Sequence, residues 1–216
     1  MSLKSRSFPV VIAAPSGAGK TTLARALVER SEGVVFAVSA TTRPPREHEV
    51  QGRDYYFVDD REFDRMIAAN ELVEWAVVHG RRYGTLRREV EEALRLGQIV
   101  LLDIDVQGAR QVRRVFPDAV LIFVLPPSAE ELHRRLLFRG SDGEAERLRR
   151  LRNARAELPA AAEFDYVVVN DDFERAVGAL QAILAAERYR VGRVVDLAGE
   201  LRRLDRELAA LMERRE

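Results

Sequence analysis

The sequence contains no cysteine, almost no lysine and no long apolar run. Without cysteine the chain can form neither disulfides nor thiolate metal sites, which excludes the class of disulfide-stapled secreted proteins. No apolar run approaches the length of a membrane span. The first residues, MSLKSRSFPVV, lead directly into a strand-like run instead of a cleavable signal. We therefore expect a cytoplasmic protein without a membrane partner.

The sequence also lacks an excess of either charge, because 35 Lys and Arg residues balance 35 Asp and Glu residues. A net charge of zero gives no overall field that would attract nucleic acid, so we expect no nucleic-acid partner and a local site for any small anionic ligand. Positive charge is mostly arginine, and lysine occurs only at Lys4 and Lys20. The 216 residues suffice for one substantial core with small inserted subdomains.

Residues 10–27 join an apolar strand-like run, a turn of small residues and the start of a helix without interruption. Within them, APSGAGKT matches the phosphate-binding loop pattern G-x-x-x-x-G-K-[ST], except that Ala14 replaces the first glycine. Alanine is also small, so the replacement is mild. A flexible turn alone would have no use for Lys20 followed by two threonines. The pattern predicts a nucleoside triphosphate site.

The chemistry of such a loop explains each residue type. Gly17 and Gly19 let backbone N–H groups converge on a phosphate because no side chain intervenes. The helix that begins near Lys20 adds its positive end. Lys20 can extend along the β- and γ-phosphates, and the Thr21 hydroxyl is placed to coordinate Mg²⁺. The acceptor stays open, because hydrolases, switches and kinases all use this loop.

Further apolar runs predict the other strands of a sheet, at residues 34–39, 99–102, 120–125 and 166–170. The run at 99–102 reads as a central parallel strand, and Asp103 and Asp105 follow it directly. An acid at the carboxyl end of such a strand can order Mg²⁺ and its waters. Alternatively it caps the next helix, which suits Asp105 better than Asp103.

The polar segment at residues 39–58 carries more signals than a connector needs. Pro44 and Pro45 stiffen it and hold Arg43 and Arg46 at a set separation. Two guanidinium groups and a tyrosine hydroxyl can clamp a phosphate monoester. From composition alone, a solvated basic loop with incidental tyrosines is an equally good interpretation.

Glu74 lies within the strand-like run LVEWAVV, at residues 72–78, where a carboxylate is unusual. The side chain points either outward, on the wet face of a sheet, or inward, to accept hydrogen bonds from a ligand. The outward orientation is the commoner case for isolated acids.

Two helical features occupy the second half of the chain. Residues 128–159 form an arginine-rich hairpin, with Ser128 and Glu131 as a capping box. Such a hairpin has the makings of a lid that brings positive charge over a phosphate, although most of its arginines could instead pair with glutamates. Near the end of the chain, leucines form a narrow a/d stripe at Leu197, Leu201, Leu204, Leu208 and Leu211. The stripe favours a homodimer or larger assembly over folding back on its own domain.

Taken together, these motifs resemble guanylate kinase. The similarity covers roughly residues 9–189, and its motifs occur in a linked order: APSGAGKT, SATTRPPREHEVQGRDYYF, EW at 74–75, YGT at 83–85, LDIDVQG from 102, the arginine helices and VNDD from 169. Each motif alone is modest evidence, but their order and spacing are highly specific.

The resemblance implies an α/β fold of the P-loop kinase type, with a core parallel β-sheet flanked by helices, an inserted GMP-binding subdomain and a helical lid. The whole chain would be one domain. Its parts would be a core at 8–38, 99–127 and 160–189, a GMP-binding subdomain at 39–98, a lid region at 128–159 and a C-terminal helical extension at 190–216. The implied reaction is Mg²⁺-dependent transfer of the ATP γ-phosphoryl group to GMP, and to dGMP, in purine nucleotide metabolism.

The resemblance also implies roles residue by residue. The residues expected to bind ATP are Ala14, Pro15, Ser16, Gly17, Ala18, Gly19, Lys20, Thr21 and Thr22, with Asn170 near adenine. Those expected to hold the GMP phosphate are Ser39, Arg43, Arg46, Tyr55 and Tyr83, with Glu49 as the acid of the GMP-binding loop. Guanine would be read by Glu74 and Thr85, with Asp105 nearby. The implied catalytic residues are Lys20, Arg43, Arg135, Arg139 and Arg150, and the implied Mg²⁺ residues are Thr21 and, through water, Asp103. His48 stands where the family usually has glycine.

Base chemistry agrees with an inward Glu74. Guanine presents N1–H and its exocyclic amine side by side, so one carboxylate accepts both, while a hydroxyl such as that of Thr85 can donate to O6. Adenine has an acceptor at N1 and lacks the amine. Loss of such a pairing costs about 1–3 kcal/mol by analogy with base readout in DNA. We therefore expect Glu74 to point into the site and to select guanine.

Two other classes of function compete with this interpretation. A catalytically silent guanylate-kinase-like domain would typically have lost residues of the ATP-binding loop, yet Lys20, Thr21 and Asp103 are all present. A P-loop GTPase would carry an N-K-x-D base-reading loop, which we do not find. A kinase for another nucleoside monophosphate would be exposed by a nucleotide screen.

Overall fold

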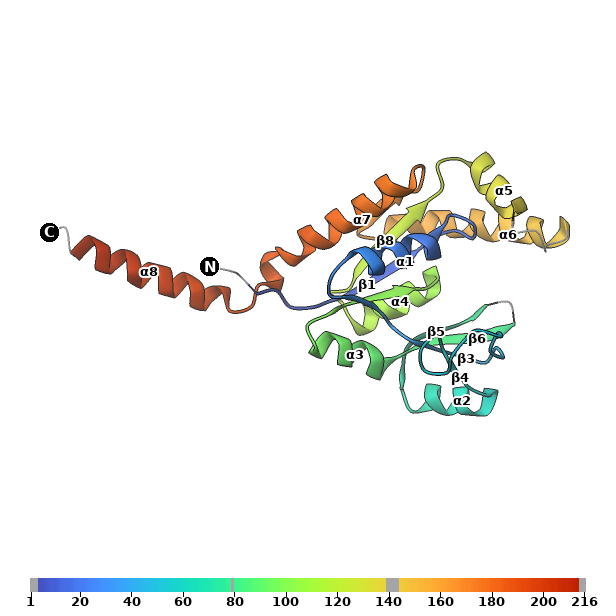
Figure 1. Cartoon of the computed structure of the whole chain (residues 1–216), viewed down its shortest axis with the longest axis horizontal. Helices are drawn as coiled ribbons and strands as arrows, with labels where there is room; N and C mark the ends of the chain where they lie inside the picture. Colours follow the sequence, from blue (N-terminus) through green and yellow to red (C-terminus); the bar gives the residue numbers. More distant parts are fainter. Residues whose placement is uncertain (1–3, 79, 139–143, 214–216) are drawn as a thin grey trace.

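The computed structural model describes residues 4–78, 80–138 and 144–213. Its centre is a five-stranded sheet of parallel strands in the order β2-β7-β1-β8-β9 (Figure 1). The strands are β1 (Pro9–Ala13), β2 (Val34–Phe36), β7 (Ile99–Asp103), β8 (Val120–Leu125) and β9 (Tyr166–Val169). Because all five run the same way, their carboxyl ends meet at one edge, where open α/β sheets bind ligands.

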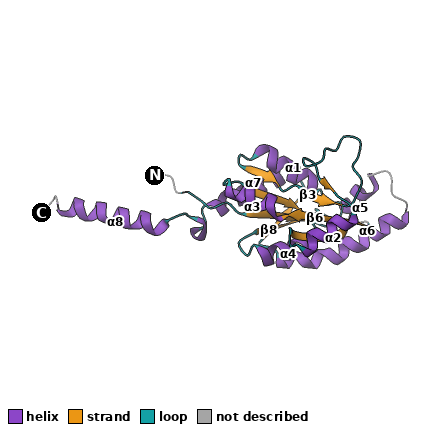
Figure 2. Ribbon diagram, turned by 90° about the horizontal axis from the view of Figure 1, so that it is seen from below, coloured by secondary structure: helices purple, strands orange, loops and turns teal. Residues whose placement is uncertain are grey.

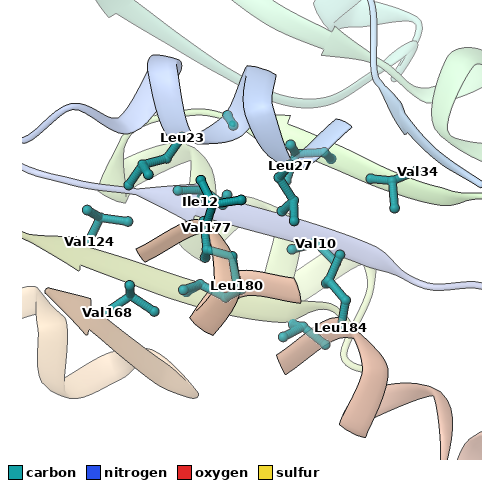
Figure 3. Packing of buried hydrophobic residues seen from close by; sticks show 14 of the residues in the cluster. Val10, Ile12, Leu23, Leu27, Val34, Val124, Val168, Val177, Leu180 and Leu184 are labelled. Carbon is teal, nitrogen blue, oxygen red and sulfur yellow. The ribbon is translucent and has the colours of Figure 1, made fainter. Parts of the chain in front are cut away.

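Helices cover both faces of this sheet, which explains why its strands are continuous apolar runs. The covering helices are α1 (Lys20–Arg30), α3 (Arg87–Arg95), α4 (Val106–Val115) and α7 (Phe173–Arg188). Side chains alternate along β1, so Val10 and Ile12 pack with α1 and α7 (Figure 3), while Val11 packs on the opposite face with α3 and α4. The core strand that precedes the phosphate-binding loop is therefore buried on both sides.

A second sheet of four strands has the order β4-β3-β6-β5 and lies beneath the core in Figure 1. Its strands are β3 (Ser39–Thr41), β4 (Tyr56–Phe57), β5 (Leu72–Val78) and β6 (Arg81–Leu86). The helix α2 (Asp60–Ala68) packs on this sheet through Phe63 and Met66. All four strands fall within the segment expected to bind GMP.

The prediction of a single strand at residues 34–39 was wrong. The run divides into β2 in the core sheet and β3 in the second sheet. The Ala37 N–H still donates to the Leu101 carbonyl, at 3.1 Å, beside the core, whereas Ser39 already pairs with Thr85. Apolar patterning identified extended chain but not which neighbouring strand it would meet.

Two helices, α5 (Ala129–Phe138) and α6 (Glu144–Glu157), form the arginine-rich hairpin, and the 3-10 helix η1 (Leu158–Glu163) follows it. Half of the predicted capping box is confirmed, because Ser128 Oγ accepts the Glu131 N–H at 3.1 Å. The Glu131 carboxylate accepts hydrogen bonds from Arg134 and Arg135. Leu132 and Leu136 of α5 pack with Ala154 of α6. The predicted catalytic residue Arg139 lies outside the described residues.

The C-terminal helix α8 (Leu197–Glu213) projects away from the rest of the chain (Figures 1 and 2), and none of its residues is buried. It follows a short 3-10 helix, η2 (Val191–Arg193), that is firmly anchored. The Arg193 guanidinium is buried, lies 3.9 Å from the Phe8 ring centroid and pairs with Glu187 at 3.0 Å. No helix in the described part of the chain is both long and apolar enough to cross a membrane.

Candidate active site

The phosphate-binding loop follows β1 and leads into α1. Gly17 and Gly19 have φ values of 94° and 91°, in the left-handed region that favours glycine. A Cβ at Gly19 would also collide with Nδ2 of Asn170. Glycine is therefore needed at position 19 for both conformational and steric reasons.

Asn170 and Arg135 hold this loop through the carbonyl of Ala18. Asn170 Nδ2 donates to that oxygen at 2.8 Å, and Arg135 donates to it at 3.2 Å. Arg135 also donates to the Asn170 carbonyl at 3.0 Å. The Asn170 amide is directed at the loop, because Ala18 is fully buried and its carbonyl needs a donor. Its place near adenine stays a prediction.

Lys20 is paired with the acid at the end of the neighbouring strand. Its Nζ lies 2.6 Å from Asp103 Oδ1 and donates to the Ile104 carbonyl at 2.7 Å. Asp103 Oδ1 is buried and makes no hydrogen bond in the described chain, so its contact with Lys20 is an ion pair. β1 and β7 bring the two residues together, since Ile12 pairs with Asp103. The ammonium group of Lys20 carries three N–H donors, so one remains for a phosphate.

The oxygen donors available for Mg²⁺ are the Thr21 hydroxyl and the Asp103 carboxylate, which line the same cavity. Hard oxygen ligands suit Mg²⁺, which usually keeps several waters and is held largely by substrate phosphates. Over the ranges that the structure describes, no cluster of three or more His, Cys, Asp or Glu side chains could hold a metal by itself. The residues therefore fit an ion bound mainly by phosphates and water, with Thr21 and Asp103 as the protein's contribution.

A cavity of about 660 Å³ extends from α1 to the second sheet. The five residues predicted to hold the GMP phosphate line it, as does Glu49, the predicted acid of the GMP-binding loop: Ser39, Arg43, Arg46, Glu49, Tyr55 and Tyr83. Arg25 lines it as well and was missed. Its position one helical turn after Thr21 was the available signal. With Arg53, which also lines it, the cavity gathers four arginines around a space suited to an anionic group.

Arg43 and Glu49 order the loop that borders this cavity. Arg43 donates to both carboxylate oxygens, at 2.8 and 2.9 Å, and the Arg46 N–H donates to Glu49 at 2.8 Å. These bonds, that of Arg43 first, lower the pKa of Glu49 to about 2. Both side chains of the ion pair are only 16% exposed, so this pair is not part of a freely solvated loop, whereas residues 44–48 between them are exposed. His48 keeps a negative φ, so its replacement of glycine does not strain the turn.

Glu74 points inward, as predicted, and is only 4% exposed. Its Oε1 accepts the Thr85 hydroxyl at 2.6 Å and the Thr85 N–H at 3.0 Å. We predicted that this hydroxyl donates to guanine O6. Because its single proton is directed at Glu74, that role requires the hydroxyl to rotate. Burial, chiefly, raises the pKa of Glu74 to about 7, and the charge of Asp105 adds to the effect.

Asp105 has one of its predicted roles in the structure, that of a helix cap. Its side chain caps α4 by accepting the Gly108 N–H at 2.8 Å, which confirms the alternative interpretation as a helix cap. It also lines, with Glu74 and Lys20, a cavity of about 280 Å³. The cap uses Oδ1 alone, and the predicted place of Asp105 near guanine stays a prediction.

The helix α6 carries Arg150, the remaining predicted catalytic residue, and Glu157, which was not predicted. Arg150 lies on α6 with its side chain half-buried. Glu157, at the end of the same helix, has a buried Oε2 without a hydrogen-bond partner among the described residues, and burial raises its pKa. Nothing in the sequence distinguishes Glu157 from the other glutamates of this arginine-rich helix.

Comparisons with known proteins agree on one family. A family model described as guanylate kinase matches residues 6–187. The chain is 51% identical over 180 residues to a guanylate kinase of Polaromonas sp., covering 83% of this chain and 87% of that protein. It is 46% identical over 203 residues to a guanylate kinase of Geobacter sulfurreducens, covering 94% and 100%. The crystal structure of guanylate kinase from Anaplasma phagocytophilum matches with a TM-score of 0.75 at 37% identity, covering 91% of this chain and 94% of that one. The chain therefore belongs to the guanylate kinase family.

Proposed function

We propose that this chain transfers the γ-phosphoryl group of ATP to GMP and to dGMP, giving ADP and the nucleoside diphosphate. The observation that carries the proposal is the cavity of about 280 Å³ that Lys20, Thr21 and Glu74 all line. The phosphate-handling residues and the buried acid share one space, as direct transfer between two aligned nucleotides requires. Membership of the guanylate kinase family supports the same reaction.

The chemistry calls for alignment and charge neutralisation. A phosphate monoester oxygen of GMP is already ionised at neutral pH, so it attacks without a general base. Mg²⁺ bound with ATP supplies further charge neutralisation on the phosphates. Lys20 and the hairpin arginines, namely Arg135, Arg139 and Arg150, neutralise the γ-phosphoryl group, while Arg43 and Arg46 hold the acceptor in line. Closure of the hairpin would exclude water as a competing acceptor.

Base selection rests on Glu74. As a carboxylate it accepts both N1–H and the exocyclic amine of guanine. Its burial removes water that would otherwise satisfy a wrong base, which sharpens discrimination. Adenine would place a lone pair against the carboxylate, and a pyrimidine would not reach it with paired donors.

The test is ADP release with GMP, dGMP, AMP, CMP and UMP in turn. We expect GMP and dGMP to support turnover, and the others to do so at a small fraction of the rate. Release of ADP without any nucleoside monophosphate would indicate an ATPase. No release with GMP would favour the silent binding domain, and preference for another base would refute the role of Glu74.

We further infer that α8 joins two copies of this chain. Leu201, Leu204, Leu208 and Leu211 are 57%, 38%, 60% and 57% exposed, so the predicted stripe is solvated in a single chain. We expect wild type to be a dimer or larger by light scattering, and the Leu204→Asp/Leu208→Asp variant to be a monomer. Arg206→Asp, on the polar side of α8, is the matched control. A monomeric wild type would refute the inference.

The cysteine-free composition supports a cytoplasmic location as part of the proposal.

A further inference from the structure

The strand β5, which carries Glu74, is the edge of the second sheet. An edge strand leaves backbone N–H and C=O groups without a strand partner. At Trp75 the helix α4 supplies that partner. Gln111 Oε1 accepts the Trp75 N–H at 3.1 Å, and Gln111 Nε2 donates to the Trp75 carbonyl at 2.9 Å. One side-chain amide therefore pairs with both the N–H and the C=O group of Trp75, as a neighbouring strand would.

The residue held in this way directly follows Glu74, and α4 also contacts Glu74 itself. A Cβ at Gly108 would lie 2.6 Å from Glu74 Oε2 and 3.2 Å from its Cδ. Gly108 and Gln111 are three residues apart and thus share one face of the helix. This face offers β5 an anchor at Gln111 and, beside it, a notch at Gly108 that only glycine leaves open.

We propose that Gln111 is a positioning residue for base selection, because its reciprocal bonds to Trp75 hold the Glu74 carboxylate in the notch at Gly108. The proposal rests on the proposed function, in which Glu74 reads guanine. The same helix begins after Asp103 and Asp105, so it also fixes the distance between the acid and the phosphate-handling end of the site. Without Gln111 the edge strand is free to shift, and the carboxylate shifts with it.

A purely structural role for Gln111 is the competing explanation, and the two explanations predict different kinetics. If Gln111 only completes the edge strand, its loss lowers stability and leaves base choice unchanged. If it positions Glu74, its loss raises KM for GMP and weakens discrimination against AMP, while KM for ATP stays the same. The split between the two substrates therefore decides between them.

The first test is Gln111→Met, which keeps the length of the side chain and removes both hydrogen bonds. We expect KM for GMP to rise about tenfold, since a misplacement of about 1 Å can reduce rates by up to about 100-fold. We expect KM for ATP to stay within about twofold of wild type. The matched control is Gln181→Met, because Gln181 also donates to a backbone carbonyl, that of Arg30 at 3.1 Å, on another part of the core.

The second test fills the notch. Gly108→Ala places a methyl group against Glu74, yet alanine is the better helix former, so the helix itself is not weakened. Gly178→Ala is the matched control, since Gly178 also lies within a helix and a Cβ there would meet nothing within 4 Å. We expect Gly108→Ala to raise KM for GMP without lowering the melting temperature, and Gly178→Ala to change neither.

Three results would overturn the proposal. Gln111→Met could retain the wild-type KM for GMP and the wild-type preference for GMP over AMP. Its KM values for GMP and ATP could instead rise in parallel with a fall in melting temperature, as a purely structural role predicts. A wild-type protein that forms no ADP with GMP would refute the proposed function, and this inference with it.

Discussion

The Thr85 hydroxyl donates to Oε1 of Glu74 at 2.6 Å, and the N–H of the same threonine donates to the same oxygen at 3.0 Å. The two residues are opposite each other in the antiparallel pair β5–β6. Oε2 lies on the side of Gly108, on α4. The acid is thus oriented by the protein before a base arrives, which limits the reorganisation needed for recognition.

Glu74→Gln should impair the use of GMP specifically. Glutamine offers one acceptor oxygen where guanine needs two, and its amide NH₂ group places a donor against a guanine donor. We expect kcat/KM for GMP to fall by about 10- to 100-fold, in line with about 1–3 kcal/mol for a bidentate base contact. KM for ATP should be unchanged. Glu92→Gln, at an exposed position of α3, is the control, and equal losses for both variants would contradict the prediction.

The affinity for GMP should increase with pH through neutrality. Burial raises the pKa of Glu74 to about 7, and only the ionised carboxylate accepts both guanine donors. KM for GMP should therefore fall as the pH rises through about 7. The phosphate of GMP titrates near pH 6, at about the second pKa of a phosphate monoester, so Glu74→Gln supplies the background curve. Identical pH profiles for the two proteins would argue against the assignment.

The same pKa shift predicts a pH dependence of stability. The pKa of Glu74 is about 7 in the folded chain against an ordinary value of 4.5, so between these values the folded state binds the proton more tightly. The free energy of unfolding should then decrease as the pH rises across this window, by up to about 3 kcal/mol. Urea unfolding of wild type and Glu74→Gln at several pH values measures the difference. A difference that grows with pH in favour of wild type would have the wrong sign.

Lys20→Ala should nearly abolish turnover. The variant removes the cation that neutralises the transferred group, an effect of about 1,000-fold or more in sites of this kind. It also leaves the half-buried Asp103 without its ion-pair partner. The measurement is a coupled assay of ADP release with GMP, and the control is Lys4→Ala, the other lysine of the chain. A rate near that of wild type would remove Lys20 from the mechanism.

Arg193→Ala should destabilise the fold without changing the chemistry. Arg193 and Glu187 are 6% and 5% exposed, and Glu187 also accepts the Tyr166 hydroxyl at 2.6 Å. Removing one partner of a buried pair leaves an uncompensated charge, which typically costs about 3–5 kcal/mol. Urea unfolding checks this, with Arg61→Ala, at an exposed position of α2, as control. A loss no greater than that of Arg61→Ala would show that the pair contributes nothing.

The sequence predicted elements better than it predicted their neighbours. The loop, its strand and its helix follow from local rules, and so do the caps at Ser128 and Asp105. The run at 34–39 was predicted as one strand because apolar patterning records burial but not which sheet provides it. The split into β2 and β3 depends on contacts with β7 and β6, which lie far along the chain.

In the candidate site, the residues that line it were predictable, whereas their hydrogen-bond partners were not. Residue types and motif order predicted which side chains would gather around the phosphate cavity. They did not predict that the Thr85 proton goes to Glu74, or that the Asn170 amide goes to Ala18. Which acceptor such a donor binds depends on interatomic distances, and these are determined only by the folded chain. The bonds of Gln111 to Trp75 were not predicted for the same reason.

Near its ends the chain is joined to itself, because Ser5 forms an antiparallel bridge with Val194 and the Arg6 N–H donates to the Arg193 carbonyl at 2.8 Å. This junction precedes the amino end of β1, whereas Lys20 and Asp103 lie at the carboxyl ends of the core strands. A fluorescent protein or a surface tether attached at either terminus would thus stand clear of the nucleotides. In a pulling experiment the load would fall on this junction first, and the enzyme could be held by its two ends while it still turns over.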